Sequence, residues 1–581
     1  MRHAFQAPLW FDGAFGTYYF SLTGDETPCE LANLKNPALV GQIHREYLKA
    51  GATALKTNTF AANPGTLPDP EQLGTVLQAG LEIAQKAAAE HGAEVFADIG
   101  GISAADAEQF YLTVAERFLD LGATSFLFET LPSYEELVPA LKRIRQRKPE
   151  SKIVVSFAVS QDGYTRRGLS HRALAGIAAA DGHADAVGFN CVCGPSHMVS
   201  LVKSLGEISC PIIAMPNAGY PSSLNGRVIF EDNAGYFATR MVELYQAGVD
   251  LLGGCCGTTP RHIAQAVQAV YSVTRSERLM AVSKRTVESQ VLPHGGKGKK
   301  VIAVELAPPQ DCDCSFLLSA AGELKSCGAD MITVSDSPLS RARADSLMIA
   351  AKIRREVGIE VLPHLCCRDK NHIALKAGIL GAALEGINRV LVITGDPPVQ
   401  SNMRNPGVFS FNSFDLISFI ASMNTDLFSG RPFLIGGALN VNAANFPVEL
   451  ERARKKIARG AGMLFSQPIF SEQAVKNFLL ASRELDCALF AGILPVAGYR
   501  NALFLVNEVS GIEIPDAVMQ SLKDKTPAQA AEISIAYSAG ILEQVYDAAD
   551  GFYIMTPLKR VDIVRGLIER IHRREEQEES K

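Results

Sequence analysis

Short apolar runs that end in small or polar residues recur along the whole chain, with helical segments between most of them. In the first half the runs start at residues 9, 53, 94, 124, 152, 185, 211 and 250, and in the second half at residues 301, 331, 360, 389, 433, 463, 488 and 551. Several follow a helix that stops at a glycine, as in LKAGATALK and LKSCGADMI. Glycine commonly ends a helix, and a continuous apolar run is typical of a buried parallel strand. The pattern therefore predicts eight strand–helix units in each half.

Eight such units in roughly 270 residues are typical of a (β/α)8 barrel, although a doubly wound sheet also alternates strands and helices. The count of eight favours barrels. We therefore predict an α/β chain of two (β/α)8 TIM barrels in tandem, over residues 1–275 and 301–581. Residues 276–300 are polar and basic and end in glycines and lysines, which is typical of a linker.

Composition narrows the function. The chain has 581 residues, 47% of them hydrophobic, and a net charge of −6, which gives no reason to expect nucleic acid or an anionic membrane as a partner. No apolar run reaches the roughly 18 residues that a membrane span needs. The N-terminus lacks the apolar segment of a secretory signal, so we expect a cytoplasmic protein whose 12 cysteines are reduced thiols.

Polar residues follow many of the predicted strands, and the carboxyl ends of barrel strands carry the active sites of such folds. In the first half these residues are Asp12, Asn58, Glu129, Cys191, Asn217, Cys255 and Cys256. In the second half they are Glu305, Asp336, His364, Asp396, Asn440 and Gln467.

Three cysteines stand at the ends of the sixth and eighth predicted strands of the first half, in GFNCVCGP and LLGGCCGT. The two strands flank the seventh, so Cys191, Cys255 and Cys256 can converge. Three thiolates and one open position suit a catalytic Zn2+, and such a centre activates a substrate thiol. The alternative is that these cysteines are ordinary buried residues. From the residues alone both interpretations stay open.

The first half resembles the homocysteine S-methyltransferase family through DGAFGT, TNTF, FET, GFNCVCGP and GGCCGTTPRHI. The resemblance implies that Cys191, Cys255 and Cys256 hold Zn2+ and that Cys193 has no part in the site. It also implies that Asp12, Gly13 and Glu129 lie near bound homocysteine.

The second half has Glu305 in VELAPP, Asp396 in VITGDPP and Gln467 in FSQPIF. Each is a weak signal by itself, because a strand-end carboxylate is more often a helix cap or turn residue than a catalytic group. With PHLCCRD and GFYIMTP, these segments resemble methylenetetrahydrofolate reductase, a family of FAD-containing barrels. The resemblance implies Glu305 as the general acid, Asp396 near the pterin and flavin, and Gln467 on the pterin. It places FAD near His364, Asp396 and Lys456, with NAD(P)H as electron donor.

Together the halves resemble bifunctional enzymes that make methionine from homocysteine and 5-methyltetrahydrofolate from 5,10-methylenetetrahydrofolate. The methyl donor stays open among S-methylmethionine, S-adenosylmethionine and a separate methylcobalamin protein. An alternative is an active methyltransferase whose second barrel uses another electron donor or is a ligand-binding regulatory or scaffold module. The oligomeric state, including a homo-oligomer, also stays open.

Overall fold

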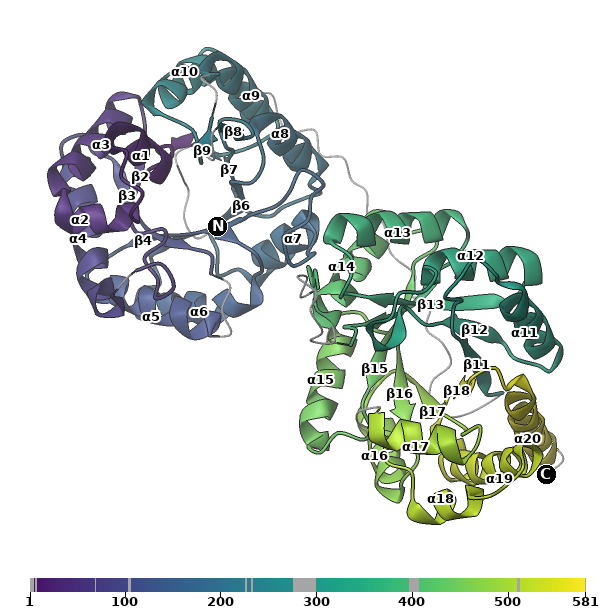
Figure 1. Ribbon diagram of the computed structural model, residues 1–581. Helices are drawn as coiled ribbons and strands as arrows, with labels where there is room; N and C mark the ends of the chain where they lie inside the picture. Colours follow the sequence, from purple (N-terminus) through teal and green to yellow (C-terminus); the bar gives the residue numbers. More distant parts are fainter. Residues whose placement is uncertain are drawn as a thin grey trace. The chain divides into compact units, whose positions relative to one another are not determined.

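The computed structural model describes residues 5, 8–67, 69–102, 106–224, 227–230, 233–274, 299–396, 407–508 and 512–579. The chain divides into two compact units, Met1–Lys284 and Arg285–Lys581. Most of the expected linker, residues 276–298, lies outside the described residues, so its limits stay a prediction. Each unit in Figure 1 is a ring of helices around its strands.

The first unit contains eight parallel strands in the order β1-β10-β7-β6-β5-β4-β3-β2. Their bounds are β1 Leu9–Trp10, β2 Ala54–Lys56, β3 Glu94–Gly100, β4 Ser125–Leu131, β5 Lys152–Phe157, β6 Ala186–Asn190, β7 Ile212–Met215 and β10 Leu251–Leu252. A parallel bridge between Phe11 and Ala54 joins the two outer strands, and Thr53 N donates to Trp10 O at 2.7 Å beside it. The sheet is therefore a closed barrel.

Helices surround this barrel. They are α1 Gly16–Thr23, α2 Ala32–Lys35, α3 Pro37–Lys49, α4 Leu73–Ala89, α5 Ala107–Asp120, α6 Val138–Arg147, α7 His171–Asp181, α8 Pro195–Ser204, α9 Ala234–Gln246 and α10 Pro260–Tyr271. A short antiparallel hairpin, β8 Ser222–Leu224 and β9 Arg227–Ile229, follows β7 and was not expected from the sequence.

The second unit is a closed barrel of eight parallel strands in chain order. They are β11 Val301–Leu306, β12 Met331–Val334, β13 Glu360–Cys366, β14 Arg389–Ile393, β15 Leu434–Leu439, β16 Met463–Pro468, β17 Ala488–Ile493 and β18 Gly551–Met555. Its helices are α11 Ser315–Ser326, α12 Ser346–Val357, α13 His372–Leu384, α14 Ser413–Asp426, α15 Phe446–Ala458, α16 Glu472–Glu484, α17 Tyr499–Glu508, α18 Asp516–Leu522, α19 Pro527–Val545 and α20 Val561–Glu579.

All sixteen predicted strands are present, and the prediction of two tandem TIM-like barrels is confirmed. The glycines that ended the predicted helices explain part of this success. Gly51, Gly122, Gly328 and Gly460 each follow a helix with φ between 88° and 114°, where a side chain would be strained. They stop each helix where the next strand must begin.

Alternation along the strands decides which side chains enter each barrel. Every strand of the first barrel contributes to one interior cluster, which includes Ala54, Phe96 and Leu127. The second barrel is filled in the same way, with Ala303 and Leu362 among its interior residues. Since side chains alternate with a period of two, the residue two positions later faces the mouth at the carboxyl end.

Candidate functional site

The ends of β6 and β10 bring the three cysteines of the first barrel together around β7. Cys191 N donates to Met215 O at 3.1 Å, and Cys255 N donates to Pro216 O at 2.9 Å. Ala218 N donates to Cys256 O at 2.9 Å. Three backbone hydrogen bonds thus fix both cysteine loops to the segment that follows one strand.

The cysteine turns depend on backbone conformations that only a supported structure holds. Cys191 and Val192 have φ of 59° and 58°, which is uncommon for residues with a Cβ. Gly257 has φ of 81°, and a Cβ there would lie 2.3 Å from Phe230 Cγ. A Cβ on Gly254 would lie 2.4 Å from Thr258 Oγ1. The glycines around the cysteine pair are therefore required by the turn itself.

The three sulfurs have the spacing of a metal site. The Sγ atoms of Cys191, Cys255 and Cys256 all lie within 4.8 Å of one another, and those of Cys191 and Cys256 are 3.7 Å apart. Tetrahedral zinc with Zn–S bonds of about 2.3 Å needs sulfurs about 3.8 Å apart. The triad therefore fits Zn2+. Cys193 is buried elsewhere, with its Sγ hydrogen donated to Val159 O at 3.0 Å.

A buried cluster of carboxyl groups and one lysine lies beside the sulfurs. Lys56 N donates to Asp12 Oδ2 at 3.2 Å, and Lys56 Nζ is 3.6 Å from Asp12 Oδ1. Asn190 Nδ2 donates to Glu129 Oε2 at 3.0 Å and is 3.9 Å from Cys255 Sγ. The amide of Asn190 thus connects the carboxyl cluster with the thiols.

Burial controls the charges in this cluster. Burial raises the pKa of Asp12 to about 7, and it also raises the pKa of Glu129. Burial alone would lower the pKa of Lys56, but the carboxylates of Glu129 and Asp12 outweigh it and raise that pKa. Lys56 therefore stays positively charged. The two carboxyl groups beside it lose their protons at a higher pH than exposed carboxyl groups do.

Sequence reasoning named Asp12, Gly13 and Glu129 here and missed Lys56, Asp98 and Asn190. Asp12 and Glu129 join the cluster. Gly13 adds no side chain and is closely packed, since a Cβ there would be 2.7 Å from Thr258 Oγ1 and 2.8 Å from the Tyr47 ring. Lys56 and Asp98 follow the interior residues Ala54 and Phe96 by two positions, and this alternation was the signal that could have found them.

The second barrel has a cavity of about 440 Å3 at the carboxyl ends of its strands. Six of the seven residues named in this half line it, and Asn440 does not. The lining residues, including several that were not named, are Glu305, Ser335, Asp336, Pro338, His364, Arg368, Leu391, Val392, Ile393, Thr394, Gly395, Asp396, Ser413, Ala438, Arg452, Lys456, Phe465, Ser466, Gln467, Tyr553 and Met555. The volume is in the range of small-molecule and cofactor sites. The fold therefore gathers one candidate site from seven of the eight strands and the segments that follow them.

Glu305 is the acidic group at the centre of this cavity. The Tyr553 hydroxyl donates a hydrogen bond to Glu305 Oε2, and His364 Nε2 lies 3.9 Å from the same oxygen. Burial raises the pKa of Glu305 to about 7 and lowers the pKa of His364 to about 4. Near neutral pH the histidine is thus uncharged, and Glu305 is poised to hold or release a proton. Tyr553 was missed, because its partner is 248 residues away in the sequence.

Cations line another part of the wall. Lys456 Nζ donates to Ala438 O and is 4.0 Å from Glu449 Oε1, and Arg452 lines the same cavity. Gln467 is exposed at the mouth. The cavity therefore offers positive charge for an anionic group and hydrogen-bonding groups for a heterocycle. The Nε2 atom of His364 is buried and has no hydrogen-bond partner among the described residues. These residues fit a flavin nucleotide.

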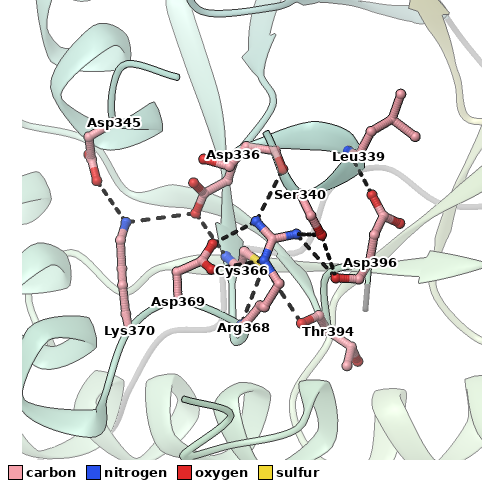
Figure 2. Close-up of polar contacts among 11 residues, drawn as sticks. Asp336, Leu339, Ser340, Asp345, Cys366, Arg368, Asp369, Lys370, Thr394 and Asp396 are labelled. Atoms are coloured by element: carbon pink, nitrogen blue, oxygen red, sulfur yellow. Dashed lines mark hydrogen bonds and ion pairs between the residues drawn. The ribbon is translucent and has the colours of Figure 1, made fainter. Parts of the chain in front are cut away.

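Arg368 lines this cavity. Its polar contacts join three loops, as Figure 2 shows. Its guanidinium makes two hydrogen bonds to the Asp369 carboxylate, at 2.9 and 2.6 Å. Further bonds go to Ser337 O at 3.1 Å, to Ser340 Oγ at 3.0 Å and to Asp396 O at 3.2 Å. All five N–H donors of the buried side chain are thus engaged.

The loop that Arg368 holds is strained. Ser337, Leu339 and Ser340 have φ of 47°, 55° and 56°, a conformation that costs free energy for residues with a Cβ. Leu339 N donates to Asp396 Oδ2 at 2.9 Å. The strained loop thereby orients the Asp396 carboxylate, and Arg368 stabilises the loop.

Comparison with known proteins agrees with the two-unit architecture. Residues 9–270 match the family described as homocysteine S-methyltransferase, and residues 290–572 match the family described as methylenetetrahydrofolate reductase. No helix in the described ranges is long and apolar enough to cross a membrane.

Individual relatives match just under half of the chain. The methionine synthases of Mycobacterium tuberculosis and Mycobacterium leprae are 29% and 30% identical over 303 and 308 residues, which cover 46% of this chain and 25% of each relative. The chain thus spans a quarter of the length of these two relatives. The homocysteine S-methyltransferase of Escherichia coli is 26% identical over 294 residues, covering 44% of this chain and 93% of the relative.

Among solved structures, the apo form of an Escherichia coli homocysteine methyltransferase has a TM-score of 0.38 at 25% identity, and the metallated form has 0.37 at 23%. Each covers 45% of this chain and 96% of the solved chain. Because of the two family matches, the chain carries a domain of the homocysteine S-methyltransferase family in residues 9–270 and a domain of the methylenetetrahydrofolate reductase family in residues 290–572.

Proposed function

We propose that the first barrel transfers a methyl group to the sulfur of homocysteine, forming methionine at a zinc centre held by Cys191, Cys255 and Cys256. The observation that carries this proposal is the 3.7 Å separation of the Cys191 and Cys256 sulfurs within a cluster of three, in a domain of this family. Zinc, when bound, would lower the pKa of the homocysteine thiol and keep it as a nucleophilic thiolate.

The chain's own residues then orient the amino acid. Asp12 and Glu129 lie in the buried cluster beside the sulfurs, where carboxylates attract the substrate's ammonium group. Apolar side chains fill the barrel interior, and a thiolate shielded from water on that side would attack a methyl group more readily than a fully solvated one. The methyl carbon forms a bond to the homocysteine sulfur as its bond to the donor breaks, and the donor leaves with that electron pair.

A sulfonium donor, S-methylmethionine or S-adenosylmethionine, suits this site because its positive charge makes the departing sulfur a good leaving group. The N5-methyl of a folate is a far poorer substrate for direct transfer. The chain has only a partial match to the cobalamin motif D-x-H-x-x-G, DGHADA at 181–186, in the first barrel. A separate methylcobalamin protein is the rival donor.

For the second barrel we propose reduction of 5,10-methylenetetrahydrofolate to 5-methyltetrahydrofolate. FAD, when bound, would carry hydride from NAD(P)H to the folate. Lys456 would hold its diphosphate, and His364 and Asp396 would contact the flavin region. Glu305 would protonate the folate as its five-membered ring opens, and Gln467 would hold the pterin at the mouth.

Purified full-length protein tests both proposals. We expect about one zinc per chain and methionine formation from homocysteine with one of the three candidate donors. We also expect a flavin absorbance spectrum that bleaches with NADH or NADPH and returns when 5,10-methylenetetrahydrofolate is added. Absence of zinc would contradict the first proposal. A flavin that stays oxidised with both nicotinamides would favour another electron donor, and absence of flavin would favour a scaffold or regulatory role for the second barrel.

A further inference from the structure

Lys56 is a buried ammonium group at the mouth of the first barrel. It is the last residue of β2, and 6% of its surface is exposed. The residue two positions earlier, Ala54, belongs to the barrel interior, so the lysine side chain enters the mouth rather than the helical shell. A cation is rarely buried at such a place without charged partners.

The partners present leave the ammonium group incompletely bonded. Among the described residues, the Lys56 ammonium nitrogen lies 3.4 Å from Gly254 O and 3.6 Å from Asp12 Oδ1, and the charge of Glu129 also attracts it. Charge-assisted hydrogen bonds from nitrogen to oxygen are normally about 2.7–2.9 Å long. An ammonium group has three N–H donors, so Lys56 has room for a ligand oxygen at full hydrogen-bond strength.

Two carboxyl oxygens near Lys56 also lack a hydrogen bond. The Oδ1 atoms of Asp12 and Asp98 are buried, and neither has a hydrogen-bond partner among the described residues. The carbonyl that Lys56 contacts belongs to Gly254, the residue before Cys255. One small region next to the sulfur triad thus contains an under-bonded cation and two carboxyl oxygens that accept no hydrogen bond from the described residues, although Asp12 Oδ1 is ion-paired with Lys56 at 3.6 Å.

We propose that Lys56 binds the α-carboxylate of the thiol amino acid, while the free oxygens of Asp12 and Asp98 accept hydrogen bonds from its α-ammonium group. This inference rests on the proposed function of the first barrel and adds the source of its substrate specificity. The site then selects a zwitterion: a thiol with both an amine and a carboxylate binds well, and a thiol with the amine alone does not.

A different role for Lys56 would be to neutralise the carboxyl cluster and the thiolates, with no contact to the substrate. The two roles predict different responses to a ligand without a carboxylate. L-homocysteine and 3-aminopropane-1-thiol share the thiol, the amine and the chain between them, and differ only in the α-carboxylate.

The experiment measures binding of both thiols to the zinc-loaded full-length chain by calorimetry, for the wild type, Lys56→Met, Lys56→Arg and the exposed control Lys86→Met. We expect the wild type and the control to prefer homocysteine by about 100-fold, the scale of a lost buried charge pair. In Lys56→Met homocysteine should bind about 100-fold more weakly, while binding of the amine thiol changes by less than about threefold. Lys56→Arg should restore part of the preference.

Zinc content is measured in parallel. Equal weakening of both thiols in Lys56→Met, an unchanged preference for homocysteine, or loss of zinc would each overturn the proposal and assign Lys56 to the carboxyl cluster or metal centre. A wild type that holds zinc and methylates homocysteine would keep the proposed function intact in all three cases. A wild type that binds neither zinc nor homocysteine would instead contradict the proposed function itself.

Discussion

The hydroxyl of Tyr553 donates a hydrogen bond to the carboxylate of Glu305 across the seam between β18 and β11. Tyr553 pairs in register with Ala303, two residues before Glu305, so both side chains are on the inner face of the barrel. The ring of Phe465 meets the Tyr553 ring edge-on at 5.4 Å and helps to fix it. The proton affinity of Glu305, the candidate general acid, therefore depends on a side chain from the neighbouring strand.

Removal of this hydroxyl should shift the pH dependence of folate reduction. A general acid with a pKa of about 7 is active when protonated, so the rate should fall as pH rises through about 7. Tyr553 stabilises the ionised form, and Tyr553→Phe should therefore raise the pKa of Glu305 and move the fall to higher pH by about one unit. The rate is measured from pH 5.5 to pH 9.

Reduction of the flavin by the nicotinamide does not need this proton, so that half-reaction should keep its profile in the variant. Tyr537→Phe is the matched control, because the Tyr537 hydroxyl bonds the backbone carbonyl of Phe470. A Tyr553→Phe profile that coincides with that of the wild type would refute the coupling.

Loss of any one sulfur of the triad should remove the metal. Changing Cys191, Cys255 or Cys256 to Ala should weaken zinc binding by more than about 100-fold, since even loss of an outer partner commonly costs about 10–100-fold. Zinc per chain after dialysis gives the measurement. Cys193→Ala should retain zinc, because its sulfur bonds Val159 O instead. Equal zinc in all four variants would exclude the triad as the site.

The turn that carries Cys255 and Cys256 should not tolerate a Cβ at Gly257. Gly257→Ala adds a contact of 2.3 Å with Phe230 to the strain of a positive φ, so zinc content should fall and the first unit should unfold at a lower temperature. Gly24→Ala is the control: φ is 69° there, but no atom lies within 4 Å of the added Cβ. It should cost only the backbone strain of about 1–2 kcal/mol and keep zinc. Similar zinc loss in both variants would show that the Phe230 contact is not the cause.

The five hydrogen bonds of the Arg368 guanidinium should be needed for the protein to retain its flavin. Arg368→Met leaves the carbonyls of Ser337 and Asp396 without their donor and releases a strained loop, at a cost of about 3 kcal/mol to the second unit. We expect the Kd for FAD to rise about tenfold or more. Arg368→Lys should rescue little, because an ammonium group cannot form five directed hydrogen bonds.

The control for charge is Arg355→Met, which removes an exposed ion pair with Glu385 in the same unit. It should leave FAD binding and stability nearly unchanged, since surface pairs contribute about 0–1 kcal/mol. If Arg368→Met binds FAD as tightly as the wild type, the loop that contains Ser337 and Ser340 keeps its conformation without the Arg368 hydrogen bonds, and the prediction is wrong.

Local signals in the sequence were enough to predict the sixteen strands, the two barrels and the position of the three cysteines close to one another. Strands and helices follow from short-range periodicity and from glycines such as Gly51 and Gly460, which adopt left-handed conformations at helix ends. The cysteines needed only the order of the last three strands, because β7 separates β6 from β10.

Tertiary structure decided the partners within each site. Glu305 meets Tyr553 because β11 pairs with β18. Lys56 on β2 meets Gly254 after β10 because β1 lies between these two strands and is bridged to both when the barrel closes. Arg368 bonds three loops whose conformations include left-handed residues that no local propensity favours. These contacts join residues up to 248 positions apart, and their energies depend on burial and exact distance, which the order of residues alone does not specify.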